Sequence, residues 1–444
     1  MNRASQNENL VAVPVGRLVR LGHISTVTAK VSSTMAFDGI SQLITGQIPV
    51  IKDLLLTPQN ISRLTEQLAK MRGAAMKIGQ LVSMDSSGFL SPELTQIMAR
   101  LRDNAYAMPP SQLKQVLNAQ LQMGWLTSFK KFDVRPIAAA SIGQVHRAQL
   151  KDGRDLAIKI QYPGVATSIN SDIANIGVLI KMSGLLPKGF NLAAYLEEGR
   201  KQLHEETNYV QEATNLSKFK GLLKDAPQFI VPAVHSDWSS PTILAMDYVD
   251  GVAIESLSSA TQEVRDNVII NLIELALKEL LDFRLMQTDP NFANYLYNHN
   301  TQQIVLLDFG AVTKINSDIV NKYKRLLYAG LNNDTDALMG AASSIGFVDS
   351  STSMEHHVNI SQMISSVFSV ILKDGSINFS NLDLPQQLQI EGLALLEDGF
   401  LPPILPINIL LIQRKFAGIF LLAMKLSANV NIRKILQAQR QFRP

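Results

Sequence analysis

The segment at residues 285–312, LMQTDPNFANYLYNHNTQQIVLLDFGAV, constrains the fold of this chain more than any other stretch. It holds two carboxylates, Asp289 and Asp308, and an amide, Asn294, that follows the first carboxylate by five residues. An apolar run at residues 304–307 precedes Asp308, as expected of a buried strand that ends at a functional side chain. Carboxylate and amide oxygens are hard ligands that suit magnesium. The segment therefore predicts a metal site shared by a loop and a strand end.

The same spacing is typical of kinases, in which D-x-x-x-x-N lies in the catalytic loop and D-F-G follows a strand. Asp308-Phe309-Gly310 alone would be a common turn, but the upstream Asp289 and Asn294 favour a nucleotide site. Protein kinases carry His-Arg directly before the catalytic aspartate, whereas this chain carries Gln287-Thr288. The pattern therefore predicts kinase-type chemistry on a loop that departs from ordinary protein kinases.

A second nucleotide signature lies upstream. Residues 138–145, AAASIGQV, match the kinase pattern G-x-G-x-x-G-x-V with alanine at the first two glycine positions. A predicted hairpin turn at residues 151–154 then leads to the strand LAIK, whose lysine is Lys159. Residues 246–251 resemble a kinase hinge, where backbone groups hold adenine. The predicted nucleotide contacts are Ala138, Ala139, Ala140, Ser141, Gly143, Val145, Lys159, Met246 and Tyr248.

Two helical segments carry further candidates. Lys77 and Gln80 lie on a different face from the apolar stripe of the helix that begins near residue 60. They are either exposed side chains of an ordinary amphipathic helix or part of a site. Neighbouring glycines favour the site, because each costs a helix about 1 kcal/mol relative to alanine. In a helix predicted at residues 196–223, Glu206 and Glu212 are candidates for buried roles, and a solvated charged face is the alternative.

Composition excludes several classes of protein. The chain has 444 residues, of which 46% are hydrophobic and 18% charged, so a large core is expected and general disorder is not. A net charge of +3 is too small to indicate nucleic-acid binding, and the absence of cysteine excludes disulfides and thiolate metal sites. Residues 268–281 and 404–422 are apolar but interrupted by charges, which predicts buried helices. A basic stretch at residues 15–33 is either a solvated helix or a contact with anionic lipid.

Six motifs, in this order, resemble the UbiB (also called AarF) family of atypical kinases. The resemblance is greatest to the branch of mitochondrial kinase-like ATPases that support coenzyme Q biosynthesis, and it runs from about Arg72 to the C-terminus. The motifs are RGAAMKIGQ, PIAAASIGQVH, AIKIQYPGV, NYxxEAxN, MQTDPNxxN and LLDFGA. Gln287-Thr288 in place of His-Arg fits this branch.

The resemblance implies an α+β, protein-kinase-like bilobal fold with an N-terminal helical extension. The expected domains are a tail and basic helical region at 1–59, the extension with its KxGQ motif at 60–125, an N-lobe with a helical insertion at 126–250, and a C-lobe at 251–444.

The resemblance also implies roles for the acidic and basic residues of the motifs. Lys159 would bind the phosphates of ATP or ADP and Glu212 would orient Lys159. Asp289 would be the catalytic-loop acid, and Asn294 and Asp308 would hold Mg²⁺. These roles are carried over motif by motif.

Three further residues are expected to regulate access to the site. The motif from Lys77 to Gln80 would lie over the active site, where a peptide substrate would otherwise dock. Glu206 matches the first position of an E-x-D motif that seats the extension, and we expect it to pair with Lys77. The third position is Asn208, so no role that needs a negative charge is expected there.

The predicted function is that of a Mg²⁺-dependent ATPase or atypical kinase that supports ubiquinone biosynthesis. The expected partners are a nucleotide and either quinone-biosynthesis enzymes or a lipid precursor, with no nucleic acid. The expected location is the cytoplasm, with peripheral contact to a membrane. Two alternatives remain open at this stage: a protein kinase that acts on other proteins, and a nucleotide-binding scaffold without turnover.

Overall fold

The structure is a computed structural model that describes residues 73–74, 77–78, 107–140, 142–183, 192–400, 402–403 and 405–439. The chain divides into two compact units. Unit 1 comprises Met1–Ser217 and Ala233–Val249, and unit 2 comprises Lys218–Pro232 and Asp250–Pro444.

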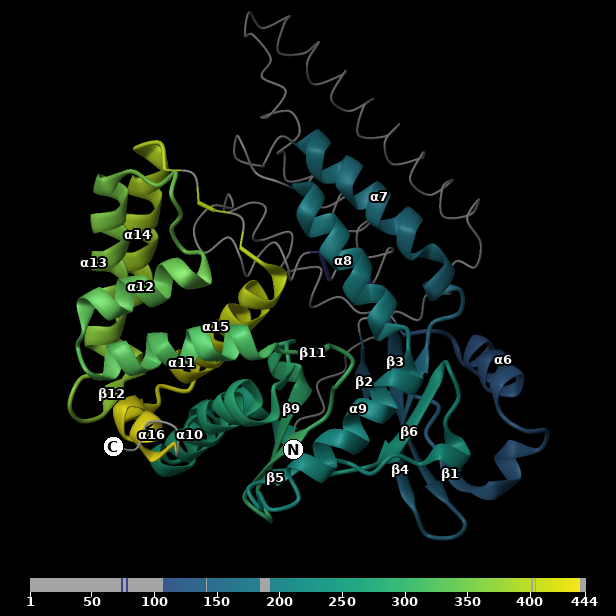
Figure 1. Ribbon diagram of the computed structural model, residues 1–444. Coiled ribbons are helices and arrows are strands. Elements are labelled where there is room, and N and C mark those ends of the chain that lie inside the picture. The colour runs from purple at the N-terminus through teal and green to yellow at the C-terminus, as the bar shows by residue number, and fades with distance from the viewer. Residues whose placement is uncertain are drawn as a thin grey trace, which may run out of the picture. The chain divides into compact units, whose positions relative to one another are not determined.

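The centre of unit 1 is an antiparallel sheet with the order β1-β3-β4-β6, and β2 pairs with β3 (Figure 1). Its strands are β1 (Phe129–Phe132), β2 (Ala138–Ala139), β3 (Gly143–Leu150), β4 (Asp155–Gln161) and β6 (Ile243–Asp247). The predicted hairpin turn between β3 and β4 is confirmed, and Gly153 supplies its left-handed backbone with φ of 98°. Leu156, Ile158 and Ile160 of β4 are buried in the core of this unit.

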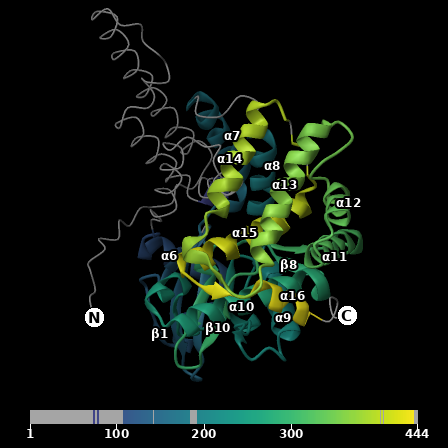
Figure 2. The ribbon, with the colours of Figure 1, turned by 90° about the vertical axis from the view of Figure 1, so that its left-hand side faces the viewer.

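From residue 107 on, the structure describes four α-helices that lie wholly or partly in unit 1. They are α6 (Pro110–Gln120), α7 (Val165–Ser183), α8 (Leu192–Glu206) and α9 (Tyr209–Leu222). Helices α7 and α8 lie side by side in both views (Figures 1 and 2), and they occupy the chain between β4 and α9. Leu196 packs so closely on Gly177 that a Cβ at that glycine would lie 2.5 Å from Leu196 Cδ1. The close packing explains a glycine in the middle of α7.

The prediction of one helix over residues 196–223 is wrong, because the chain breaks at Thr207-Asn208 to give α8 and α9. Asn208 Oδ1 accepts a hydrogen bond from the Gln211 N–H at 3.0 Å. A short polar side chain that caps the first free N–H groups starts a new helix more readily than it continues an old one. Asn208 therefore has a structural role that needs an acceptor and no charge.

Unit 2 contains three small sheets. The largest has the order β5-β10-β9-β7, and β8 pairs with β11 and β12 with β13. The strands are β5 (Phe229–Ile230), β7 (Val252–Ala253), β8 (Leu285–Gln287), β9 (Tyr295–Asn298), β10 (Gln303–Leu306), β11 (Val312–Lys314), β12 (Ile377–Asn378) and β13 (Asn429–Val430). Strand β5 ends at Ile230, two residues before Pro232, which has no N–H with which to continue a ladder.

Five of the seven α-helices described in unit 2 begin at a side-chain cap, which is Thr261, Asn316, Asp334, Ser353 or Asn431. The seven helices are α10 (Gln262–Lys278), α11 (Ser317–Leu331), α12 (Thr335–Ile345), α13 (Met354–Ile371), α14 (Leu384–Glu397), α15 (Ile407–Lys425) and α16 (Ile432–Ala438). Helix α10 continues into one turn of π-helix, Glu279–Phe283. Helices α13 and α14 lie side by side in Figures 1 and 2.

Both buried helices expected from the sequence are present, as α10 and α15, and they pack against each other. Within the described residues, α15 is the one helix long and apolar enough to cross a membrane. The core helix of a soluble protein satisfies the same criterion, and one face of α15 is buried in unit 2.

Candidate active site

The centre of the site in unit 1 is an ion pair between Lys159 and Glu212. Lys159 lies on β4 between Val145 of β3 and Leu244 of β6. Its Nζ is 2.7 Å from Glu212 Oε1 and 3.0 Å from Oε2, and the two side chains are only 10% and 1% exposed. Because isolated charges are costly to bury, each group depends on the other. The strand thus presents a cation whose position is set from α9.

The aromatic ring of Tyr209 lies beside this pair. The ring is buried, and its centroid lies 5.1 Å from Lys159 Nζ. A Cβ at Gly143 would lie 2.3 Å from the Ile160 carbonyl oxygen and 3.1 Å from the Tyr209 hydroxyl. Gly143, predicted as a nucleotide contact, is therefore required for close packing of β3 on β4 whatever else it does.

The alanine-rich segment forms a short hairpin. Ala138 and Ala139 pair with Val145 and Gln144, and both alanines are exposed. The Ala140 N–H donates to the Gly143 carbonyl at 2.9 Å, which closes the loop. Ser141, another predicted contact, lies outside the described residues. Ala138 and Ala139 thus present small, exposed side chains on the short strand of this hairpin.

The hinge-like segment is held by polar side chains. The Tyr248 N–H donates to the Asp155 carbonyl, and the Arg147 guanidinium lies 3.8 Å from the Tyr248 ring centroid. Because the Tyr248 N–H is already paired with Asp155, a hydrogen bond from Tyr248 to an adenine would have to use a different polar atom of Tyr248. Met246 is the neighbouring strand residue, paired with Ala157 of β4.

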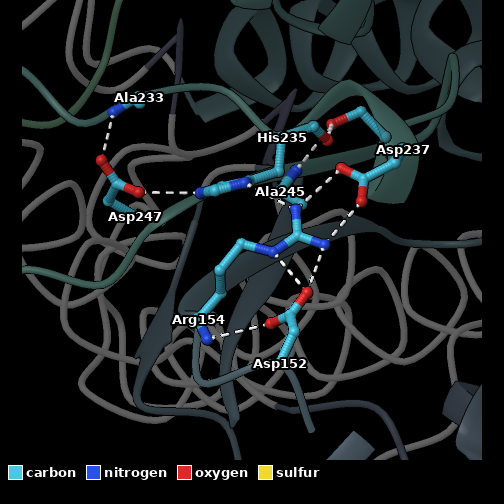
Figure 3. A network of polar contacts seen from close by, with 8 residues as sticks. Asp152, Arg154, Ala233, His235, Asp237, Ala245 and Asp247 are labelled. Atoms are coloured by element: carbon cyan, nitrogen blue, oxygen red, sulfur yellow. Dashed lines mark hydrogen bonds and ion pairs between the residues drawn. The ribbon is translucent and has the colours of Figure 1, made fainter. Parts of the chain in front are cut away.

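Figure 3 shows how Asp247, between these two residues, is fixed. Its carboxylate accepts from the Ala233 N–H at 2.8 Å and from His235 Nε2 at 2.7 Å. His235 Nδ1 lies 3.2 Å from Arg154 Nη1, which can only donate, so Nδ1 is the acceptor and Nε2 carries the proton. Arg154 also contacts Asp152 and Asp237. The network ties the hinge to the β3–β4 turn.

The expected contact between the helical extension and α8 is present. Lys77 Nζ is 2.6 Å from Glu206 Oε1, and Lys77 is 1% exposed. Lys77 and Ile78 are helical and buried, whereas Gln80 lies outside the described residues.

Sequence reasoning assigned no role to Gln144 and His146, which are both fully buried. Gln144 Oε1 accepts from the Met108 N–H, and Gln144 Nε2 donates to His146 Nε2, each at 2.8 Å. His146 Nδ1 donates to the Asp133 carbonyl, and burial lowers the pKa of His146. The Q-V-H motif thus attaches the chain before α6 to the sheet through a neutral imidazole.

Unit 2 brings the metal-ligand candidates onto adjoining loops. The Leu307 N–H donates to the Asn294 carbonyl at 3.0 Å, and the Thr288 N–H donates to the Ala311 carbonyl at 2.9 Å. Asn294 Nδ2 lies 3.3 Å from Asp289 Oδ2, which leaves the Asn294 Oδ1 atom to act as an acceptor. Asp308 Oδ1 accepts from the Gly310 N–H at 2.8 Å.

Two further contacts within unit 2 hold these loops. The buried Phe309 ring packs on Phe219 with centroids 4.5 Å apart, which anchors the residue after Asp308. Arg414 Nη2 of α15 lies 3.4 Å from Asp289 Oδ1, a contact that sequence reasoning missed. The available signal was a pair of basic residues, Arg414-Lys415, inside an otherwise apolar helix.

Comparisons with known proteins agree with these motifs. The ABC1 atypical kinase-like domain matches residues 100–342. The chain is 38% identical over 429 residues to the mitochondrial atypical kinase COQ8 of Saccharomyces cerevisiae, covering 96% of this chain and 85% of that protein. It is 35% identical over 385 residues to the mitochondrial atypical kinase COQ8B of Rattus norvegicus, covering 86% and 72%.

Among solved structures, the Mycobacterium tuberculosis protein Rv3197, determined in complex with erythromycin, superposes with a TM-score of 0.61. The alignment covers 94% of this chain and all of that one at 22% identity, so the likeness concerns the fold.

Proposed function

The chain belongs to the ABC1 atypical kinase-like family, the UbiB family expected from its motifs, and we propose that it is a Mg²⁺-dependent ATPase or small-molecule kinase. We further propose that it supports quinone-lipid biosynthesis. The buried Lys159–Glu212 pair is the observation that carries the proposal. A lysine held almost out of water by one carboxylate is suited to binding an anion that enters beside it.

The residues fit a magnesium nucleotide by the chemistry of their donors. Asp308 and Asn294 can each supply an oxygen ligand, and Mg²⁺ is commonly held by one or two carboxylates together with substrate phosphates. Magnesium bound there would neutralise charge on the phosphates. Lys159 would bind the phosphates as Glu212 holds its Nζ in place.

Asp289 would act on the acceptor side of the reaction. Its carboxylate is set by Arg414 and Asn294, so one oxygen can orient an attacking hydroxyl or water and receive its proton. The proposed outcome is cleavage of the terminal phosphate of ATP, with transfer either to water or to a small molecule.

Steady-state ATP hydrolysis tests the proposal. We expect Asp308→Asn to abolish turnover because it removes a metal ligand charge. Asp289→Asn should abolish turnover but keep nucleotide affinity, because the proposed metal ligands remain. Lys151→Ala, in the exposed β3–β4 turn, is the matched control and should match the wild type. Nucleotide binding without hydrolysis by the wild type would instead support a scaffold, and phosphorylation of added proteins would support a protein kinase.

The proposed pathway and location need a cellular test. A deletion strain should lose quinone lipids and recover them with wild-type chain, and not with Asp308→Asn. The named relatives are mitochondrial, and we propose that this chain works as a peripheral protein at a membrane that holds a lipid precursor. Release from membranes by alkaline carbonate is the expected fractionation result, and retention would argue for an integral anchor.

A further inference from the structure

Helix α15 places a buried cation under the catalytic loop. Lys415 is 2% exposed, although lysine is rarely buried without a specific partner. Its Nζ lies 2.8 Å from Gln287 Oε1 and 3.0 Å from the Tyr295 hydroxyl. These partners lie immediately before and after the segment that carries Asp289 and Asn294.

The contact continues from Lys415 to the backbone of Asp289. Gln287 accepts from Lys415 with its side-chain oxygen and donates from Nε2 to the Asp289 carbonyl at 2.8 Å. An amide can do both, whereas an acid or a hydrocarbon at this position cannot. Gln287 stands two residues before Asp289, where protein kinases carry histidine. Glutamine at this position links the catalytic loop to α15 by hydrogen bonds.

Glu279, in the π-helical turn after α10, is a buried acid that lies beside Lys415. Its Oε2 lies 3.7 Å from Lys415 Nζ, and the two side chains are 1% and 3% exposed. Burial raises the pKa of Glu279, while the charge of Lys415 acts in the opposite direction. Burial lowers the pKa of Lys415, but Glu279, Tyr295 and Asp289 together raise it by more, so the lysine remains protonated. Lys415 therefore places a positive charge beside the loop at neutral pH.

A second contact of α15 reaches the residue after Asp289. Gly418 lies one helical turn beyond Lys415, and a Cβ built on it would lie 2.3 Å from Pro290 Cβ and 3.1 Å from Pro290 Cγ. No side chain fits there unless Pro290 moves. The short distances at Gly418 are thus independent evidence that the helix and the loop are in close contact.

We propose that α15 is the support on which the catalytic loop is built, with Lys415 and Gly418 as positioning residues for Asp289. Lys415 fixes the Asp289 carbonyl through Gln287, and Gly418 sets how closely Pro290 approaches the helix. The inference rests on the proposed ATPase function, since it assigns these residues to the placement of its acid.

Kinetics of four variants test the positioning role. Lys415→Met, the double variant Lys415→Met/Glu279→Gln, Gln287→Glu and Gly418→Ala should each lower kcat about 10- to 100-fold, because a displacement of roughly 1 Å can cost on the order of 100-fold. Magnesium-nucleotide affinity should change less than about threefold, since the proposed phosphate and metal ligands are untouched. Gly340→Ala, in α12 where a Cβ meets nothing within 4 Å, is the control and should keep full activity.

The double variant separates positioning from charge balance. It removes the lysine and the buried acid together, so it keeps a neutral core but lacks the anchor for Gln287. Recovery of wild-type kcat in the double variant would show that Lys415 only neutralises Glu279, and would overturn the proposal. Gln287→Glu keeps a partner for Lys415 but loses the donor to Asp289, so unchanged kcat there would do the same.

Hydrogen exchange gives a readout that does not depend on turnover. Amides of residues 285–298 should exchange faster in Lys415→Met/Glu279→Gln and in Gly418→Ala, while those of β3 and β4 should match the wild type. Equal exchange at 285–298 in all variants would overturn the inference even if ATPase activity is present. If the wild type lacks ATPase activity but the variants show the expected exchange pattern, the proposed function is rejected. The inference that α15 supports the loop then still holds.

Discussion

Among single residues, variants of the Lys159–Glu212 pair can separate effects on nucleotide binding from effects on the stability of the protein. Lys159→Ala should reduce nucleotide affinity and turnover, and it leaves the buried Glu212 without its cation. Removing one partner of a buried pair typically costs about 3–5 kcal/mol of unfolding free energy. The double variant Lys159→Ala/Glu212→Ala should recover part of that stability and none of the binding. Urea unfolding and nucleotide titration measure the two effects, and full affinity in either variant would refute the role of Lys159.

The buried Glu279 predicts a pH dependence of stability. Burial raises its pKa to about 7 from an ordinary value of 4.5. The folded state then holds a proton that the unfolded state has lost, so stability from this group is greatest below pH 4.5 and falls as the pH rises to 7. The total loss is about 3 kcal/mol, at roughly 1.4 kcal/mol per pH unit. Lys415 stays protonated throughout this range and adds no slope.

Urea unfolding of wild type and Glu279→Gln between pH 5 and pH 8 checks this expectation. The variant lacks the titrating acid, so its unfolding free energy should fall less over this range than that of the wild type. Parallel curves would show that Glu279 has an ordinary pKa or is ionised throughout.

At the scale of elements, the β2–β3 hairpin is where alanine replaces two kinase glycines. Ala140 closes this hairpin through its N–H to the Gly143 carbonyl, and its Cβ limits the loop to ordinary backbone angles. Ala140→Gly should let the loop reach the phosphates differently and change nucleotide affinity by about 1–2 kcal/mol. We also expect more autophosphorylation and a poorer biological function. ATP affinity, ADP affinity and autophosphorylation, all equal to the wild type, would show that the alanines only pack.

Elements with a strong periodic pattern could be predicted from the sequence, and short ones could not. The apolar helices α10 and α15 and the β3–β4 hairpin follow directly from their patterns. The break between α8 and α9 depends on one cap at Asn208, in a stretch whose charged residues suit a helix on both sides. The early end of β5 depends on Pro232. Single residues that redirect the chain are weak signals in a periodic background.

At the scale of the whole molecule, motif residues were predicted together because they share a chemistry. The residues that hold the motifs in place were not predicted, since Arg414, Lys415 and Gly418 lie more than a hundred residues from the loop they contact. Gln144 was overlooked for a similar reason: its partner, the backbone N–H of Met108, has no sequence signature. Local patterns report the reacting groups, and only the folded chain reports what holds them.

The Lys77–Glu206 pair predicts how the helical extension is attached. Lys77→Met should leave Glu206 as a largely buried charge without its cation and lower the unfolding free energy by about 3 kcal/mol. Lys77→Met/Glu206→Gln should restore most of that stability. Thermal unfolding and complementation of a deletion strain are the measurements. A Lys77→Met chain with unchanged stability and full complementation would show that the pair does not seat the extension.

The distance along the chain between Lys415 and Gln287 has a consequence during protein synthesis. The two residues are 128 positions apart, so the ribosome adds α15 long after the catalytic loop has emerged. At about 5–20 residues per second, the delay is on the order of ten seconds. Throughout that interval Gln287 and Glu279 lack Lys415 as a partner. A nascent chain therefore carries the catalytic motifs before α15 can hold them in place, and we expect ATP turnover only after α15 has been added.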